Sequence, residues 1–346
     1  MNREEGCHAV LGQVRYASVF PQKGLLTKQL MNIVPDLERF GPNATKAVSM
    51  TEAREYCAKL TADHYENFSV VTWLTPRPLR PAFQAVYSFC RWSDDLGDEL
   101  GDPERSRQML AWWRQELDAM YQGRVTHPVY VALEPVVKEY GIPPEPFHDL
   151  IDAFEQDQSL TNYQTYAQLL DYCTRSANPV GRLVLYLARS YDEPRAALSD
   201  STCTALQLAN FWQDVSRDLE IGRIYLPRED RERFNVTESD IQARRITPEF
   251  RALLKFEVER TRKLFDAGRP LVKQVPHHIA VDVDLFTRGG LAILDRIEQV
   301  NFDVLTSRPA LSKFDKVRLI GRALKDRFLP GSGLQAAAPA PAGSSR

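Results

Sequence analysis

The feature that most constrains the fold of this chain is the spacing of its apolar residues, which recur every three or four positions between residues 51 and 330. The segments FQAVYSFCRW, LQLANFWQDV and LAILDRIEQV show this helical period. Prolines divide the region into pieces of ordinary helix length, because proline is strongly disfavoured in the interior of a helix. Runs typical of strands are scarce, although VTHPVYVALEPVV fits either a strand or a buried helix. We therefore predict a single all-α domain over residues 50–330, with helices packed around a central space.

The two ends of the chain lack this pattern. Residues 1–49 are weakly patterned and are predicted to be an N-terminal extension, whose deletion leaves folding and activity intact. Residues 331–346, GSGLQAAAPAPAGSSR, are rich in Ala, Pro, Gly and Ser. Such a segment buries too little apolar surface to offset its chain entropy, so we predict a disordered tail.

Charge and composition exclude several classes of protein. The 346 residues carry 44 Lys and Arg against 46 Asp and Glu, a balance that argues against nucleic-acid binding through bulk charge. No run approaches the roughly 18 apolar residues of a membrane span, and the start lacks a secretory signal pattern. The 5 cysteines are widely spaced without a C-x-x-C pair, which favours reduced thiols over disulfides or zinc. We expect a cytoplasmic protein.

Two segments carry a polar stripe within an otherwise apolar helix. One face of the first segment, YSFCRWSDDLGDE, gathers Tyr87, Arg91, Asp94, Asp95 and Asp98. One face of the second, QLANFWQDVSRDLE, gathers Gln207, Asn210, Asp214 and Asp218. Burying unpaired carboxylates in a dry core is too costly, so both stripes are expected to face a wet cavity.

The residue types in the stripes indicate a hard cation and a phosphate. Oxygen-only ligands suit Mg²⁺, which keeps several waters and bridges carboxylates to substrate phosphates. Arg91, which lies among the acids, is suited to charge-assisted bonds with a diphosphate oxygen. The sequence therefore predicts a Mg²⁺-bound diphosphate whose apolar remainder lies in the bundle. The alternative is that each stripe is a solvated helix face, but two such stripes together favour function.

At these residues the chain resembles the squalene/phytoene synthase family. The resemblance covers roughly residues 60–310, and its motifs occur in the order of the family: HYENFSV, YSFCRWSDDLGDE, YCTRSANPVG, QLANFWQDVSRD and GRIYLP. The resemblance implies an all-α isoprenoid synthase-type bundle around a central apolar cavity. It also implies that prenyl diphosphates bind through Mg²⁺ between two Asp-rich helices.

The resemblance assigns roles to individual residues. The metal ligands implied are Asp94, Asp95, Asp98, Asp214 and Asp218. The substrate-binding residues that it implies are His64, Phe68, Arg91 and Arg308. Arg217, beside the second aspartate stripe, and Tyr225, on the loop after it, are added as expected diphosphate contacts from their place in the sequence. The residues that match cavity positions beside the reacting carbons are Tyr172, Gln207 and Asn210. Gln213, which departs from the family pattern, is a further candidate catalytic residue because it can position the capturing water. Tyr225 is expected either to close over the diphosphate or to anchor its own loop by packing.

Two departures from the family pattern point to a subgroup. Gln213 precedes Asp214 where phytoene synthase-like members usually have Arg, and Gly290 stands where some members have a phosphate-contacting Tyr. Both changes remove a diphosphate contact. With HYENFSV, SANPVGRLVL, ANFWQDV and RGGLAIL, they make the chain similar to bacterial hydroxysqualene synthases of the hopanoid pathway.

That subgroup implies a reaction and neighbours in a reaction sequence. Presqualene diphosphate would ionise and rearrange, and water would capture the cation, with Asn210 or Gln213 as the polar group that holds the water. A presqualene diphosphate synthase would act before the protein and a hydroxysqualene-reducing enzyme after it. The alternatives left open are presqualene diphosphate, dehydrosqualene or phytoene synthase and, more remotely, a non-catalytic assembly factor of the same fold.

Two further expectations concern the surface. The lipid character of the substrate predicts a peripheral contact with a membrane, at the inner face of the plasma membrane, although no single amphipathic stretch identifies the docking face. Asp282 and Asp284, in VDVD, are expected to be solvated.

Overall fold

The computed structural model describes residues 33–44, 47–63 and 76–328. These residues form helices without any β-strand, and one isolated bridge pairs Asn162 with Ile224, so the all-α prediction is confirmed. The first helices along the chain are α2 (Ile33–Phe40), α3 (Met50–Asp63), η1 (Arg77–Leu79), α5 (Arg80–Asp98), α6 (Pro103–Tyr121), α7 (Pro128–Tyr140) and α8 (Glu145–Gln156). They are followed by α9 (Tyr166–Ser176), α10 (Asn178–Leu187), α11 (Glu193–Glu220), α12 (Arg228–Arg233), α13 (Glu238–Gln242), α14 (Pro248–Gly268), η2 (Arg269–Lys273), α15 (His277–Gln299) and α16 (Lys313–Phe328).

Proline and capping residues explain where several helices begin. The side chain of Asp192 accepts a hydrogen bond from the backbone N–H of Arg195 at 2.8 Å and caps α11, the longest of the described helices. Thr247 caps α14 in the same way, directly before Pro248. The segment that fitted a strand or a helix forms α7, with Pro135 inside it.

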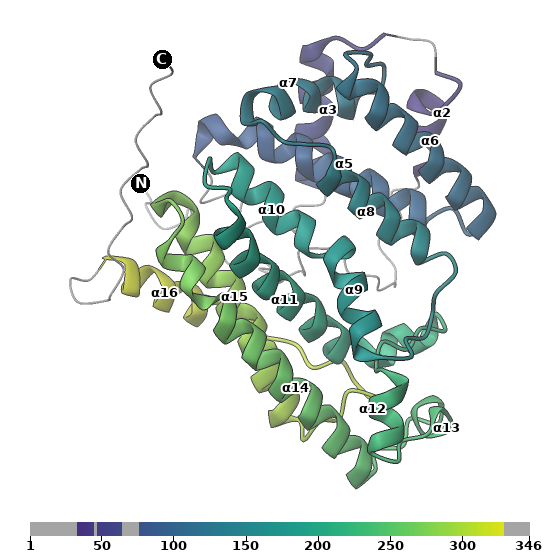
Figure 1. Ribbon diagram of the computed structural model, residues 1–346, viewed down its shortest axis with the longest axis vertical. Helices are drawn as coiled ribbons and strands as arrows, with labels where there is room; N and C mark the ends of the chain where they lie inside the picture. The colour runs from purple at the N-terminus through teal and green to yellow at the C-terminus, as the bar shows by residue number, and fades with distance from the viewer. Residues whose placement is uncertain (1–32, 45–46, 64–75, 329–346) are drawn as a thin grey trace, which may run out of the picture.

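The helices pack around two main apolar clusters. The first unites the N-terminal half and includes the fully buried Trp92 and Trp113. The second unites α9, α11, α14 and α15 and includes the fully buried Trp212 and Phe250. Figure 1 shows α11 in the middle of the C-terminal half, and it packs against α9, α10, α14 and α15.

The two helices with polar stripes belong to different halves. α5 packs against α3, α6, α7 and α8, whereas α11 packs against α9, α10, α14 and α15. α10 contacts both of them, and α8 packs against both α5 and α9. The stripes are therefore held on a common scaffold by helices that pack with both halves.

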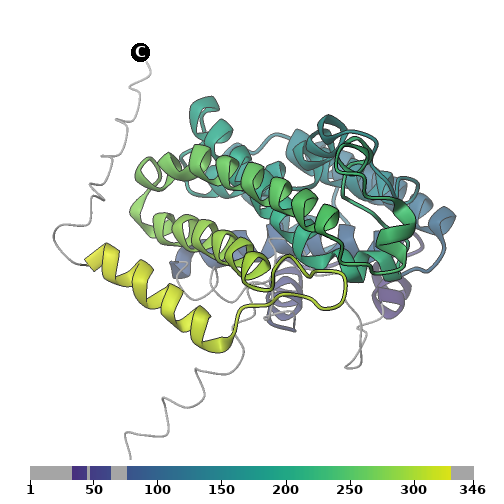
Figure 2. The same cartoon turned by 90° about the horizontal axis from the view of Figure 1, so that it is seen from below.

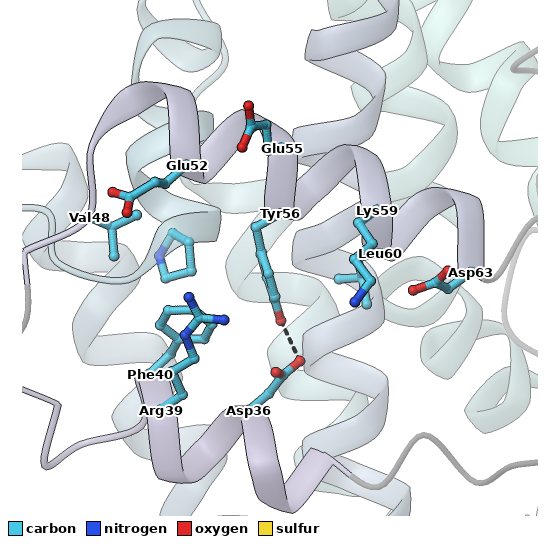
Figure 3. A pocket seen from close by; sticks show the side chains of 11 residues that line it. Asp36, Arg39, Phe40, Val48, Glu52, Glu55, Tyr56, Lys59, Leu60 and Asp63 are labelled. Carbon is cyan, nitrogen blue, oxygen red and sulfur yellow. Dashed lines mark hydrogen bonds between the residues drawn. The ribbon is translucent and has the colours of Figure 1, made fainter.

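Part of the predicted extension belongs to the packed structure. Ile33 of α2 is buried in the first cluster, and the hydroxyl of Tyr56 on α3 donates to Asp36 at 2.7 Å. These two helices border a cavity of about 300 Å³ that contains none of the predicted site residues (Figure 3). The dispensability of residues 1–49 stays a prediction. The predicted tail, residues 331–346, lies outside the described residues.

Among the helices described, none has both the length and the hydropathy needed to cross a bilayer.

Candidate active site

The stripe on α5 is built around one arginine. Arg91 donates from Nε to Asp95 at 3.0 Å and from Nη2 to Glu99 at 3.0 Å, and its Nη1 lies 3.5 Å from Asp94. Arg91, Asp94 and Asp95 are all buried, because α5 is covered by four neighbouring helices. Burial raises the pKa of Asp95 well above its ordinary value, against the opposing effect of Arg91. Three carboxyl groups thus share a single guanidinium.

The stripe on α11 is tied to the segment that precedes α16. Arg308 forms a two-pronged ion pair with Asp214, with Nη2 donating to Oδ2 at 3.1 Å. The same Nη2 donates to the amide oxygen of Gln213 at 2.8 Å, and the Gln213 amide donates to the carbonyl of Pro309 at 2.5 Å. Arg217 also approaches Asp214, with Nη1 3.9 Å from Oδ1. Asp214 therefore interacts with two guanidinium groups.

The remaining predicted residues on this stripe lie beside that cluster. Gln207 and Asn210 are half-buried on α11, and Asp218 is buried one turn beyond Asp214. Gln213 is also buried, and both ends of its amide hold the segment around Arg308. This explains in physical terms why an amide suits position 213: a second guanidinium there would lie directly against that of Arg308.

A buried carboxylate that the sequence did not single out connects the two halves. Asp157, the C-cap residue directly after α8, accepts a hydrogen bond from the hydroxyl of Tyr172 at 3.0 Å. Its backbone carbonyl accepts from Arg223 at 3.1 Å, and its carboxylate lies 3.9 Å from the same guanidinium. Burial and Asp157 raise the pKa of Tyr172 well above its ordinary value, so the phenol stays protonated and acts as the donor.

The loop after α11 brings the ends of both stripes toward one place. Burial lowers the pKa of Arg223, but the nearby acidic groups, among them Asp157 and Asp98, outweigh it and keep the guanidinium charged. Burial and Asp157 raise the pKa of Tyr225 on the same loop, and Asp218 adds to this rise. Asp98 from α5 and Asp218 from α11 thus both act on the Arg223–Tyr225 loop.

Aromatic side chains surround this loop. The rings of Phe211 and Tyr225 stack with centroids 3.8 Å apart, and Tyr225 also stacks on Tyr163 at 5.7 Å. Tyr172 lies 6.2 Å from Phe211. Tyr225 is buried, which is the arrangement expected if it anchors its loop by packing. Tyr172, Phe211 and Tyr225 form one aromatic cluster beside the buried Asp157.

The donor set fits a hard divalent cation. The five aspartates supply oxygen ligands alone, and the described residues hold no group of three or more acidic, His or Cys side chains close enough to bind a metal by themselves. Mg²⁺ is commonly held by one or two carboxylates and completes its shell with water and substrate phosphate oxygens. Two separate sets of aspartates, from α5 and α11, match that mode of binding. The metal assignment itself stays a prediction.

Other predictions have mixed outcomes. His64 and Phe68 lie outside the described residues, so their assignment stays a prediction. Asp98 is exposed at the last position of α5. Asp282 is buried, so the expectation that it is solvated is wrong, whereas Asp284 is half-buried and pairs with Arg288 at 2.7 Å.

We expect Asp157→Asn to lower kcat/KM for a prenyl diphosphate by about 10- to 100-fold, because a hydrogen bond to a charged group contributes roughly 1.5–3 kcal/mol. The amide still accepts from Tyr172 but no longer balances the buried Arg223. Steady-state kinetics and thermal unfolding measure the effect, with Asp171→Asn as control, since Asp171 pairs with Arg175 on the exposed side of α9. Wild-type kinetics for Asp157→Asn would show that the contact between Asp157 and Arg223 does not position the loop after α11.

The amino-acid sequence of this chain is similar to a known protein family and to proteins of cyanobacteria and plants. The family model described as squalene/phytoene synthase matches residues 61–315. A 15-cis-phytoene synthase of Synechococcus elongatus is 31% identical over 282 residues, which cover 78% of this chain and 91% of the relative. A plant relative, the chloroplastic phytoene synthase 1 of Solanum lycopersicum, is 26% identical over 329 residues, which cover 92% of this chain and 79% of the relative.

Two solved structures agree with the fold. The crystal structure of squalene synthase HpnC from Alicyclobacillus acidocaldarius superposes with a TM-score of 0.71 at 46% identity, over 73% of this chain and 95% of the other. A dehydrosqualene synthase in complex with a ligand superposes with a TM-score of 0.72 at 22% identity, over 80% of this chain and 96% of the other, which supports the fold alone.

Proposed function

Because this chain belongs to the squalene/phytoene synthase family, we propose that it is a hydroxysqualene synthase. In the proposed reaction, presqualene diphosphate and water give hydroxysqualene and diphosphate. The carbon–oxygen bond to diphosphate breaks first, the carbocation rearranges, and water adds to carbon with loss of a proton. This makes the protein a carbon–oxygen lyase rather than a prenyl transferase.

The observation that carries this proposal is the set of contacts among Gln213, Asp214 and Arg308. The buried amide of Gln213 holds both Arg308 and Pro309, so the residue that departs from the phytoene synthase pattern has a defined task. The second departure, Gly290, also fits its surroundings, because a Cβ atom at this position would come within 2.2 Å of Phe265. The 46% identity to a squalene synthase supports the squalene branch of the family over its phytoene branch.

The charged residues of this chain would bind and hold the diphosphate. Arg91, Arg217, Arg308 and the loop of Tyr225 would contact it, and His64 and Phe68 would contact the substrate from the N-terminal side. The aspartates of the two stripes would hold Mg²⁺, which as a Lewis acid stabilises the departing diphosphate. The ion pairs of Arg91 with Asp95 and of Arg308 with Asp214 fix these guanidinium groups on the two helices.

The apolar side of the site would stabilise the carbocation and deliver water. Each aromatic face of Tyr172, Phe211 or Phe68 near the cation would contribute about 0.5–2 kcal/mol. Gln207 and Asn210 lie half-buried on α11, the helix that also carries Phe211. Both ends of the Gln213 amide are already engaged, so Asn210 is the better candidate to hold the capturing water.

A second candidate function is head-to-head prenyl transfer, as in presqualene diphosphate, dehydrosqualene or phytoene synthesis. It is favoured by the 31% identity to a 15-cis-phytoene synthase. A non-catalytic assembly factor is disfavoured, because all five aspartates of the two stripes are present.

The proposed reaction implies one enzyme that acts before this protein and one that acts after it. A presqualene diphosphate synthase would supply its substrate, and an enzyme that reduces an allylic alcohol would consume its product. Substrate and product are lipids, so we propose a cytoplasmic protein with peripheral contact to the inner face of the plasma membrane.

Substrate choice distinguishes the two candidate functions. We expect purified protein with Mg²⁺ to consume presqualene diphosphate and release a C₃₀ alcohol, and to leave farnesyl diphosphate unchanged. Mass spectrometry of the extracted lipid measures the product, and omission of Mg²⁺ with added chelator should stop the reaction. Presqualene diphosphate from farnesyl diphosphate, or phytoene from geranylgeranyl diphosphate, would reject the proposal in favour of prenyl transfer.

A further inference from the structure

The last helix, α16, presents a continuous outer face at the edge of the molecule. Figure 2 shows it beside α15, with which it packs. Its inner side carries Leu319 and Ala323, and Ala323 joins Val281 and Leu285 of α15 in a small apolar cluster. The exposed positions recur every three or four residues, as one helical face requires: Phe314, Val317, Arg318, Gly321, Arg322 and Lys325. We call these six residues the outer face of α16.

The outer face combines exposed apolar and basic side chains. Phe314 is 73% exposed and Val317 is 47% exposed, and the only other large apolar side chain so exposed among the described residues is Ile221. Arg318, Arg322 and Lys325 continue the same face toward the C-terminus of the helix. Asp315, near its start, already accepts hydrogen bonds from Ser312 in the cap of the helix. The face is therefore apolar at one end and cationic along the rest.

From this arrangement we infer that the outer face of α16 docks the protein on an anionic lipid surface. In a chain with a net charge of −2, the described outer face holds three exposed cations, Arg318, Arg322 and Lys325, and no acid. This charge complements a negative surface and disfavours a second copy of the same face. The cations attract anionic headgroups, and Phe314 and Val317 add exposed apolar area that a membrane interface can bury.

The position of α16 connects this surface to the candidate site. The helix begins five residues after Arg308, which pairs with Asp214 on α11. A protein docked through α16 therefore has its proposed diphosphate-binding segment next to the lipid contact. The inference does not depend on which prenyl diphosphate the enzyme uses.

Vesicle sedimentation of the full chain tests the inference. We expect binding to vesicles of equal parts phosphatidylcholine and phosphatidylglycerol, weaker binding as salt rises, and little binding to phosphatidylcholine alone. The triple variant R318Q/R322Q/K325Q should bind the anionic vesicles roughly 100-fold more weakly, since each cation near such a surface contributes about fivefold. The double variant F314S/V317S should bind roughly tenfold or more weakly, because the apolar anchor is lost.

A matched control changes the same charge elsewhere. The variant K255Q/K263Q/R269Q removes three exposed cations from α14 and its end, and it should bind vesicles like the wild type. All substituted positions are exposed, and circular dichroism checks that each variant is folded. The inference is overturned if the wild type ignores anionic vesicles, if the control loses as much affinity as the α16 variant, or if F314S/V317S instead dissociates an oligomer of the wild type in sedimentation velocity.

Discussion

Replacing Asp94 and Asp214 together by asparagine should lower turnover of a prenyl diphosphate by about 10³-fold or more, because both halves of the site lose the charge that holds a hard cation. Asparagine keeps the size of each side chain but removes its negative charge. On α5 the substitution leaves Asp95 and Glu99 with Arg91, and on α11 it removes the ion pair with Arg308. The loss should therefore appear in catalysis far more than in folding.

The D94N/D214N variant needs a control in which two acidic residues outside the candidate site are replaced. E259Q/D266N alters two exposed acids of α14, each in an exposed ion pair. It should keep wild-type kinetics, since exposed ion pairs contribute little. Product formation by the D94N/D214N variant at the wild-type rate would remove the basis for a metal site between α5 and α11. Thermal unfolding in the presence and absence of Mg²⁺ adds a readout of binding, and the stabilisation by Mg²⁺ should vanish in that variant.

Substituting Gly290 should destabilise the fold, because its neighbours leave no room for a side chain. A Cβ atom at this position of α15 would lie 2.2 Å from Cζ and 2.8 Å from Cε1 of Phe265, and 3.0 Å from Leu206. We expect Gly290→Ala to lower the free energy of unfolding by about 1–3 kcal/mol through overpacking. We expect Gly290→Tyr to leave little folded protein, because the larger ring has no space beside Phe265.

Chemical denaturation measures this effect, and a second glycine provides the control. A Cβ atom at Gly321 on α16 would meet no other atom within 4 Å, so Gly321→Ala should not destabilise the protein and can add up to about 1 kcal/mol through helix propensity. Adding Gly290→Ala to a Phe265→Ala background should cost less than in the wild type, because the two residues compete for the same space. Equal costs in both backgrounds would show that the contact with Phe265 is not the cause.

The sequence predicts the helices well because their signals are local. The three- to four-residue period and the prolines are both properties of neighbouring residues, and they correctly indicate an all-α chain. The segment around Pro135 is ambiguous by the same rules, because a short apolar run fits a strand or a buried helix. Helix α2 is not evident from the sequence, since its eight residues contribute to the core through only a few contacts, such as those of Ile33.

The two polar stripes are predictable for the same local reason. Arg91, Asp94 and Asp95 lie on one face of α5, because residues three and four positions apart share a helix face. The ion pair between Asp214 and Arg308 is different, because 94 residues separate the partners. The family resemblance, not any spacing, points to Arg308.

Contacts between distant segments account for what the sequence does not reveal. Asp157 ends a helix in an ordinary polar run, EQDQS, and only the packing of α8, α9 and the loop after α11 buries it against Tyr172 and Arg223. Asp282 reads as a solvated residue in VDVD, yet it is buried on α15. Burial of a single acid depends on which helix covers it, and this is not a local property.

The most direct measurement of the proposed chemistry is the origin of the oxygen in the product. Presqualene diphosphate is incubated with purified protein and Mg²⁺ in ¹⁸O-labelled water, and the mass of the C₃₀ alcohol is determined. Capture of the carbocation by water predicts one ¹⁸O atom in the alcohol and no ¹⁸O in the released diphosphate. An unlabelled alcohol, or no alcohol at all, would contradict the account.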